Sequence, residues 1–501
     1  LEKAHKLKPH INQIWHLVLS LKMEVNDFEN VINVAEEMIK IDPLDEKIFA
    51  SIALCYQHLK NYDQSILFYK KAINIKPNYA EGWVNLGSAL REQGELEQAI
   101  EAYNKALSIK PDNAEAYHNM GIALRGIMFT KPNRDTQNTI VSILDKQSYG
   151  RPIDIAKAAI SLLKFEPNLQ KQLQLTDSKL IQSPLDVISD LSKLPLLIKL
   201  MSVCPLPDLD LETLLKNLRH ALLLNIFDIK DALPELLRFQ SALALQCFTN
   251  EYIYNHSEDE EEALQALEKI VKNTLKNNGQ PSPQAILTLA SYKALNRYDW
   301  CNLLVVTGDI WEVFIRQIEE PQKEKDLKSY LSILEEISDD VSLKVREQYE
   351  ENPYPRWVNL GIHLKPMSIP EVADSIKLKL QNYKIKDVKE PEILIAGCGT
   401  GQDSIGSATR FESSNVLAID LSLSSLAYAK RKTEELGILD IEYMQADILA
   451  LGQLNKKFDI IESAGVLHHM DNPMAGWKVL TDCLKPGGLM KIGLYSEIAR
   501  H

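Results

Sequence analysis

Three glycines separated by single residues follow a short aliphatic run in the sequence PEILIAGCGTGQDS. Gly397, Gly399 and Gly401 come directly after residues 393–396, whose composition predicts a buried strand, and a helix is expected after them. Such a turn identifies no ligand by itself. However, the next aliphatic run, NVLAID, ends in Asp420, 23 residues after Gly397. A carboxylate at the tip of a second parallel strand is suited to accept hydrogen bonds from both hydroxyls of a ribose.

Further strand patterns follow in a regular order. IEYMQADI predicts a third strand ending in Asp447, FDIIESAGVLHHM a fourth strand and turn, and LMKIGLYS a fifth strand. With the GCGTG turn, the paired acidic steps AID and QAD, and the LKPGG element, this succession resembles the class I S-adenosylmethionine-dependent methyltransferases. The turn is not GxGxxG, so it leaves room for an amino-acid moiety and not for a pyrophosphate. The resemblance implies a Rossmann-like α/β domain with strand order 3-2-1-4-5.

The resemblance also implies roles for individual residues, with S-adenosyl-L-methionine as the cofactor. Gly397, Gly399 and Gly401 would line the methionine moiety, Asp420 and Leu421 the ribose, Asp447 and Ile448 the adenine, and Glu462 and Ser463 the region of the methyl group. Methyl transfer needs no metal, and the spacing of the His and Cys residues suggests none. Cys398, inside the turn, is interpreted as a small side chain that fills space in the packing and not as a nucleophile.

Two elements near this region are candidates for substrate chemistry. His468 follows the fourth strand and is either a general base or part of a structural turn. Upstream lies the sequence QYEENPYPRW, whose two prolines are expected to hold residues 352–357 extended and to present Tyr354, Arg356 and Trp357. Tyr354 and Trp357 would then line the substrate channel over the cofactor, with Tyr354 a second candidate catalytic residue. The alternative is that the element only links two domains.

The first third of the chain is repetitive. Pro9, Pro43, Pro77 and Pro111 are each separated by 34 residues. The unit ending at Pro111 carries Trp83, Leu86, Gly87, Leu90, Gly94, Ala99, Tyr103 and Ala106. These positions resemble those of the tetratricopeptide repeat, which implies stacked helix pairs and a groove that receives a protein or peptide. Asn85 and Asn119 occupy equivalent positions and are candidates to bind a peptide backbone, or else are solvated polar positions.

Composition limits the remaining possibilities. The 501 residues carry a net charge of −13, which argues against nucleic acid held by bulk charge. No uncharged apolar stretch is long enough to span a membrane, and six scattered cysteines indicate a reducing, cytoplasmic location. Because the chain starts at Leu1, and because the resembling family normally has two further strands, we expect an internal fragment with its last sheet incomplete. The oligomeric state cannot be inferred.

The sequence therefore predicts a multidomain protein: a tetratricopeptide superhelix over residues 1–130, an α-helical middle domain over 131–340, and a methyltransferase domain over 341–501. Residues 240–501 more loosely resemble bacterial protein-lysine methyltransferases, which implies lysine amines of a protein as the acceptor. The repeats favour a macromolecular substrate as well. Two alternatives stay open: a small-molecule or lipid methyltransferase whose repeats serve assembly, and a cofactor-binding scaffold without turnover.

Overall fold

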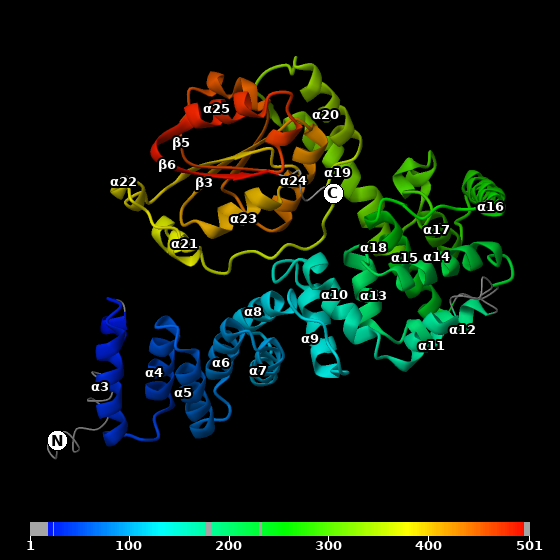
Figure 1. The fold of residues 1–501 in the computed structure, drawn as a ribbon. Helices are drawn as coiled ribbons and strands as arrows, with labels where there is room; N and C mark the ends of the chain where they lie inside the picture. Colours follow the sequence, from blue (N-terminus) through cyan, green and yellow to red (C-terminus); the bar gives the residue numbers. More distant parts are fainter. Residues whose placement is uncertain (1–18, 24, 176–182, 230–232, 495–501) are drawn as a thin grey trace. The chain divides into compact units, whose positions relative to one another are not determined.

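The computed structural model describes residues 19–23, 25–175, 183–229 and 233–494 (Figure 1). The chain divides into two compact units, Leu1–Gln170 and Lys171–His501. Pro9 and the last two residues of the predicted fifth strand, 495 and 496, lie outside the described residues.

The first unit is built of antiparallel helix pairs. Its helices are α3 (Phe28–Ile41), α4 (Glu46–His58), α5 (Tyr62–Ile75), α6 (Ala80–Gln93), α7 (Leu96–Ile109), α8 (Ala114–Leu124), α9 (Arg134–Asp145) and α10 (Pro152–Leu163), followed by α11 (Pro167–Leu175), which crosses into the second unit. The repeat residues make repeated contacts: Trp83 Nε1 donates to the Pro77 carbonyl at 3.0 Å, and Tyr117 Oη to the Pro111 carbonyl at 3.1 Å. The predicted repeat architecture is confirmed.

Helical stacking continues beyond the last recognisable repeat. Helix α9 packs on α7 and α8, and α10 packs on α8 and α9. Asn104 of α7 donates to the Thr136 hydroxyl at 2.9 Å and accepts from Thr139 at 2.7 Å. The structure thus groups residues 134–163 with the repeats, whereas the sequence placed them in the middle domain.

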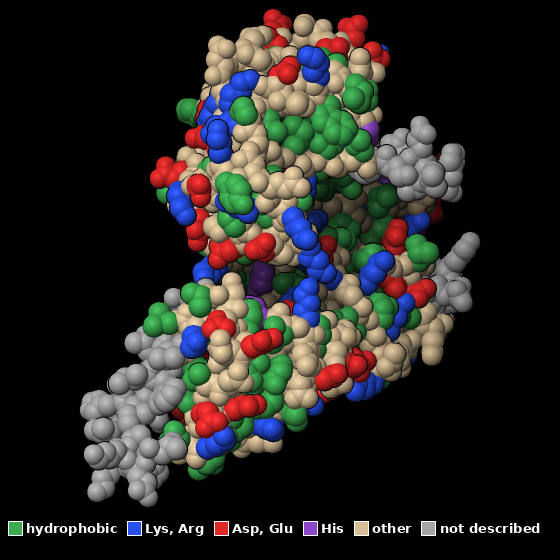
Figure 2. Space-filling view, turned by 60° about the vertical axis from the view of Figure 1, so that its left-hand side comes forward, with side chains coloured by type: hydrophobic (Ala, Val, Ile, Leu, Met, Phe, Trp, Pro, Cys, Tyr) green, Lys and Arg blue, Asp and Glu red, His purple; other side chains and the backbone are tan. Residues whose placement is uncertain are grey.

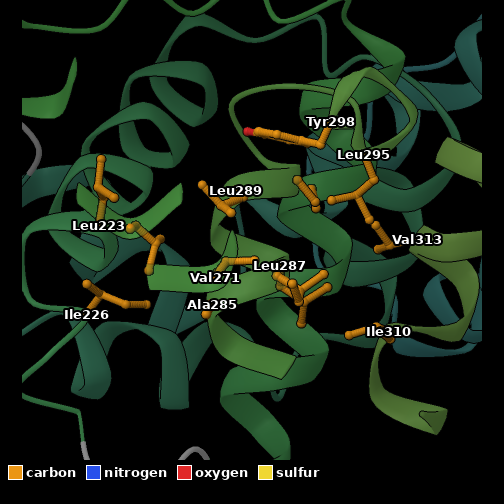
Figure 3. Close-up of a cluster of buried hydrophobic side chains, with 14 of the residues drawn as sticks. Leu223, Ile226, Val271, Ala285, Leu287, Leu289, Leu295, Tyr298, Ile310 and Val313 are labelled. Atoms are coloured by element: carbon orange, nitrogen blue, oxygen red, sulfur yellow. The ribbon is translucent and has the colours of Figure 1, made fainter. Parts of the chain in front are cut away.

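Helices also make up the first part of the second unit. They are α12 (Pro184–Leu191), α13 (Pro195–Val203), α14 (Leu209–Leu224), α15 (Pro234–Thr249), α16 (Glu258–Lys276) and α17 (Pro283–Ala290), followed by the short turns η1 (Leu295–Arg297) and η2 (Cys301–Leu303). Side chains of α14, α16 and α17 converge with Leu295, Ile310 and Val313 in one buried cluster (Figure 3). This cluster is the hydrophobic core of the middle region.

A parallel sheet forms the C-terminal part of the second unit. Its strands are β1 (Ser332–Ile333), β2 (Glu392–Ala396), β3 (Asn415–Asp420), β4 (Ile441–Gln445), β5 (Phe458–Ala464) and β6 (Leu484–Gly493), in the order β1-β4-β3-β2-β5-β6. All neighbouring pairs are parallel. The strand order 3-2-1-4-5 predicted from the sequence is confirmed in β4-β3-β2-β5-β6. Strand β6 begins earlier than predicted, because LKPGG continues the strand through an irregular register.

Helices cover both faces of this sheet. The remaining elements are α20 (Asp340–Glu351), α21 (Ile369–Ser375), α22 (Tyr383–Lys386), α23 (Gln402–Arg410), α24 (Leu423–Glu435), η6 (Ile448–Leu454), η7 (Leu467–His469) and α25 (Pro473–Cys483). Ile393 and Ile395 pack with α21, α23 and α24 on one face, and Leu394 and Ala396 pack with η6 and α25 on the other. Alternate strand residues thus enter two separate cores, as expected of a doubly covered sheet.

One continuous helical segment joins the middle region to the sheet domain. This connecting helix (residues 308–330) comprises η3 (Gly308–Ile310), α18 (Trp311–Phe314), the π-helical turn η4 (Ile315–Glu319), α19 (Glu320–Leu327) and η5 (Lys328–Tyr330). Gln317, near its middle, is buried and donates to the carbonyls of Ala244 and Ala290 at 3.3 and 3.1 Å. Further on, Glu324 binds the buried Arg431 of α24 at 2.8 Å. The helix therefore belongs to both regions.

Acidic and basic side chains are both spread over the face shown in Figure 2. Among the described residues, no helix is long and apolar enough to cross a membrane. Within the same ranges, no group of three or more His, Cys, Asp and Glu side chains is arranged to hold a metal ion.

Candidate functional site

The glycine turn lies where the strand order reverses. Strand β2 has β3 on one side and β5 on the other, and the turn follows its carboxyl end, the usual ligand position in open α/β sheets. All three glycines have positive φ, of 79°, 51° and 87°. A Cβ on Gly397 would lie 2.3 Å from Val466 Cγ2, and one on Gly401 would lie 2.6 Å from the Ala429 Cβ. Two elements therefore fit closely against the turn: helix α24 and the stretch of chain that follows β5.

Asp420 ends β3 beside this turn, as predicted. Its Oδ2 accepts the Gly399 N–H at 2.8 Å and its Oδ1 accepts the Ser422 N–H at 3.0 Å. Burial raises the pKa of Asp420; the backbone hydrogen bonds oppose this shift, and the negative charge of Glu350 adds to it. A carboxylate has about four lone-pair sites, so each oxygen retains a site for one further donor. The arrangement fits a diol with two hydroxyl donors.

The remaining residues assigned to the ribose and adenine lie along the same edge. The Leu421 carbonyl accepts from Gln445 Nε2 at 2.7 Å. Asp447 follows β4 and caps η6, with its Oδ1 accepting the Leu449 N–H at 2.9 Å. The Ala446 N–H donates to the Asp420 carbonyl at 3.2 Å, which holds the ends of β3 and β4 together. Ile448 is buried next to them. The structure thus brings Asp420 and Asp447 to adjacent strand ends.

Glu462 and Ser463, near the end of β5, differ in their surroundings. Glu462 is 4% exposed; it accepts from Ser407 of α23 at 2.9 Å and pairs with Lys491 of β6 at 2.8 Å and Arg410 at 3.7 Å. Its carboxylate is thus engaged by α23 and β6. The Ser463 hydroxyl is buried without a hydrogen-bond partner among the described residues. It is the better placed of the two to receive a ligand atom.

The segment of residues 349–357 lies on the glycine turn. Thr400 Oγ1 donates to the Pro355 carbonyl at 2.7 Å, Trp357 Nε1 donates to the Thr400 carbonyl at 3.1 Å, and the Tyr354 carbonyl lies 3.5 Å from a Cβ built on Gly399. Tyr354 is exposed as expected, but Trp357 is only 8% exposed. The expectation that Trp357 presents its ring at the surface is wrong, because its indole packs against Tyr428 and bonds to the turn.

Other contacts of this segment were not foreseen from the sequence. Glu350 accepts the Ser424 N–H at 3.0 Å and lies 3.1 Å from the Ser422 hydroxyl, at the start of α24. Lys328 of the connecting helix donates to Glu350 at 2.7 Å. These partners lie between 22 and 96 residues apart in the sequence. The only local signal for such contacts was the group of serines at the start of α24.

The candidate catalytic residues lie at the same end of the sheet. His468 is in η7, directly after β5, with its ring centroid 4.2 Å from that of His469. Burial raises the pKa of the Cys398 thiol well above its usual value, and the nearby Asp420 charge adds to this, so the thiolate nucleophile is suppressed.

The predicted peptide-binding asparagines belong to the first unit. Asn85 lies on α6 and Asn119 on α8, and both are half-buried. Asn119 Nδ2 donates to the Ser88 hydroxyl at 3.4 Å, so its amide bridges neighbouring repeats. Asn119 therefore retains only part of its hydrogen-bonding capacity for a ligand.

Family models match both predicted regions. The model described as a methyltransferase domain matches residues 393–488. Models described as tetratricopeptide or TPR repeats match residues 46–79, 68–101 and 87–125. The chain therefore contains tetratricopeptide repeats and a methyltransferase domain. The matched regions contain the glycine turn, Asp420 and Asp447, together with Asn85 and Asn119.

Several known proteins are similar to parts of this chain. A release factor glutamine methyltransferase of Flavobacterium psychrophilum is 39% identical over 95 residues, 19% of this chain and 33% of that protein. A ubiquinone biosynthesis O-methyltransferase of Coxiella burnetii is 30% identical over 145 residues, 29% of this chain and 58% of that protein. The structure of PKMT2 from Rickettsia typhi in complex with AdoHcy is 27% identical, covers 20% of each chain, and has a TM-score of 0.19. The chain thus spans only part of each.

Proposed function

We propose that this protein binds S-adenosyl-L-methionine at the glycine turn and transfers its methyl group to a protein substrate recruited by the repeats. One observation carries the cofactor assignment. The Asp420 carboxylate is fixed by the N–H groups of Gly399 and Ser422 and keeps free acceptor sites. Beside it, a Cβ on Gly397 or Gly401 of the turn would overlap with neighbouring side chains. This donor set fits an adenosine with an attached amino acid.

The residues of the chain would mainly bind and orient. Bound S-adenosyl-L-methionine supplies a methyl group on a positively charged sulfur. When the methyl group is transferred, the remainder of the cofactor leaves as a neutral thioether. Asp420 holds the ribose hydroxyls, Asp447 the adenine, and the glycine turn the amino-acid end. The 349–357 segment covers the turn and excludes water from it. Such positioning, with solvent excluded, accounts for much of the rate enhancement of a displacement reaction.

A lysine amine is the proposed acceptor. The repeat array supports a macromolecular substrate, since a small metabolite needs no peptide groove, and Asn85 and Asn119 are candidates to bind the recruited chain. A lysine has a pKa near 10.4 in water and must lose its proton before attack. Exposed Tyr354, whose carbonyl lies over Gly399, and His468 after β5 are the candidate groups to accept an amine hydrogen.

A small-molecule acceptor is the second candidate. It is favoured by the similarity to the ubiquinone biosynthesis O-methyltransferase, which extends over 145 residues and is thus longer than the similarity to the release factor enzyme. In that case the repeats would serve assembly. A protein that binds the cofactor without turnover is the third outcome.

Labelling distinguishes these functions. We would incubate the full chain with methyl-labelled S-adenosyl-L-methionine and host lysate, and separate protein from small-molecule and lipid fractions. Methyl-lysine recovered from labelled protein supports the proposal, label only in the small-molecule or lipid fraction supports the second candidate, and binding without label supports the scaffold.

Binding itself is tested with Asp420→Asn and, as the matched control, Asp440→Asn at the exposed opposite end of the sheet. Asp420→Asn should lose affinity for S-adenosylhomocysteine and Asp440→Asn should not. Because burial raises the pKa of Asp420, its ionised form opposes folding above that pKa. Asp420→Asn removes this charge but turns an NH2 group toward one of the two N–H donors, of Gly399 or Ser422, so the two effects on folding oppose each other. The unfolding temperature of the variant is therefore measured beside its affinity, and a folded variant without affinity supports the assignment. Retained affinity in this variant would contradict the assignment.

A further inference from the structure

The start of helix α24 is bound from outside by one carboxylate. Glu350, at the end of α20, accepts the Ser424 N–H at 3.0 Å, while its own carbonyl accepts from the Ser424 hydroxyl at 2.7 Å. The Ser422 hydroxyl lies 3.1 Å from the Glu350 carboxylate and 3.0 Å from the Tyr349 carbonyl. A negative charge at a helix N-terminus is also favoured by the helix dipole. Residues 349 and 350 therefore fix both Ser422 and Ser424.

This short stretch of α24 orients Asp420. The Ser422 N–H donates to Asp420 Oδ1 at 3.0 Å, and Ser422 is only two residues further along the chain. Any movement of Ser422 away from Glu350 would turn that N–H away from the carboxylate. The other oxygen of Asp420 is held by the Gly399 N–H. Glu350 thus controls one of the two hydrogen bonds that set the direction of the Asp420 carboxylate.

A lysine compensates the charge of Glu350. Lys328 Nζ lies 2.7 Å from Glu350 Oε1 and 2.5 Å from the Ser424 hydroxyl. Burial alone raises the pKa of Glu350, but the hydrogen bonds from Lys328 and Ser424 outweigh it and lower that pKa, so the carboxylate stays ionised. Lys328 belongs to the connecting helix, which is anchored along α24 by Glu324 and Arg431. Lys328 is therefore held on α24 by the connecting helix, whose earlier part is buried in the middle region through Gln317.

From these contacts we infer that Glu350, held by Lys328, is a positioning residue for the adenosine half of the cofactor and acts through Ser422 on Asp420. The inference rests on the proposed function, because it concerns the same cofactor. It assigns a role to two residues outside the matched methyltransferase region of 393–488. Glu350 is not a catalytic residue, since its contacts are with Ser422, Ser424 and Lys328.

Calorimetric titration of the full chain tests this role. The probes are S-adenosylhomocysteine and 5′-methylthioadenosine, which shares the adenosine but lacks the amino acid. Glu350→Gln keeps the size of the side chain and loses the charge, so we expect about tenfold weaker binding, the usual effect of losing a charge-assisted hydrogen bond. The loss should be equal for both probes, because the ribose is common to them. Once methyl transfer is measurable, KM for the cofactor should rise while kcat stays within about twofold.

Matched variants keep the result interpretable. Glu351→Gln changes the next, exposed residue of α20 and should bind like the wild type. Lys328→Met should weaken binding in the same direction as Glu350→Gln, and Lys328→Arg should restore most of it. A binding stoichiometry near one shows that each variant is folded. Unchanged affinity in Glu350→Gln, or a loss confined to S-adenosylhomocysteine, would overturn the inference. If the wild type bound neither probe, the proposed function itself would fail.

Discussion

Substitution of Gly397 by alanine tests how closely the chain after β5 fits against the glycine turn. The backbone φ of Gly397 is 79°, a left-handed conformation that costs an L-residue about 1–2 kcal/mol. The added Cβ would lie 2.3 Å from Val466 Cγ2 and 2.8 Å from Cγ1, an overlap of the kind that costs about 1–3 kcal/mol. Gly397→Ala should therefore lower the free energy of unfolding by about 2–5 kcal/mol.

The two contributions can be separated with a second substitution. Val466→Ala removes both Cγ atoms, so the double variant should regain the overlap energy and keep the cost of the positive φ. The interaction energy between the two substitutions should be about 1–3 kcal/mol in a double-mutant cycle. Urea unfolding followed by tryptophan fluorescence measures it, and titration with S-adenosylhomocysteine reports the effect on the turn.

A nearby glycine provides the matched control. Gly406 lies inside α23, directly after the same turn, and a Cβ there would have no atom within 4 Å. Gly406→Ala should stabilise the helix by about 0.5–1 kcal/mol. If Gly397→Ala behaved like Gly406→Ala, or if Val466→Ala gave no interaction energy, the close fit between the turn and the chain after β5 would be refuted.

Three further predictions follow from other contacts. Because burial raises the pKa of Asp420, cofactor affinity should fall on acidification as the pH passes through that raised pKa. Titrations of the wild type and of the control Asp440→Asn across the acidic range should show the same step, and an affinity that does not fall there would contradict the prediction. Arg431→Met leaves the carboxylate of Glu324 buried without its partner and should lower the free energy of unfolding in urea by about 3–5 kcal/mol. As a control, Lys478→Met at the exposed pair with Asp482 should lower it by less than about 1 kcal/mol. Gly87→Ala places a Cβ 2.5 Å from the Tyr103 ring and should lower the unfolding temperature of the repeat unit measured by circular dichroism, with cofactor affinity unchanged.

The glycine turn, Asp420 and the alternation of strands and helices were predictable because they follow from local signals, whereas the strand order came from the resemblance to the methyltransferase family. Positive φ values require glycine, and aliphatic runs that alternate with helices indicate a parallel sheet. The repeats were predictable for a similar reason, since small residues at a fixed period mark the sites where helices approach closely. In each case one stretch of sequence carries the whole requirement.

The parts that were missed depend on partners far apart in the sequence. Strand β1 has two residues and therefore no measurable periodicity, and α19, with the sequence EPQKEKDL, has no apolar face. Glu324 and Arg431 are 107 residues apart, so their pairing left no local signal. Trp357 was expected to present its ring because the two prolines before it, Pro353 and Pro355, indicate an extended segment. They do not indicate that the segment folds back onto Thr400.

The connecting helix has a consequence for how this protein can be divided and recombined. A catalytic module excised at residue 341, where the sequence places its beginning, would lack β1, Lys328 and two of the acidic partners of Arg431, Glu320 and Glu324. The buried guanidinium would then face solvent on one side, and the ribose end of the site would lose its outer support. A fusion protein that keeps the methyltransferase domain intact must therefore start before Gly308. Because Ile310 and Val313 lie in the core of the middle region, the fusion must include that region as well. Through this helix, the methyltransferase domain and the middle helices are joined in one compact unit.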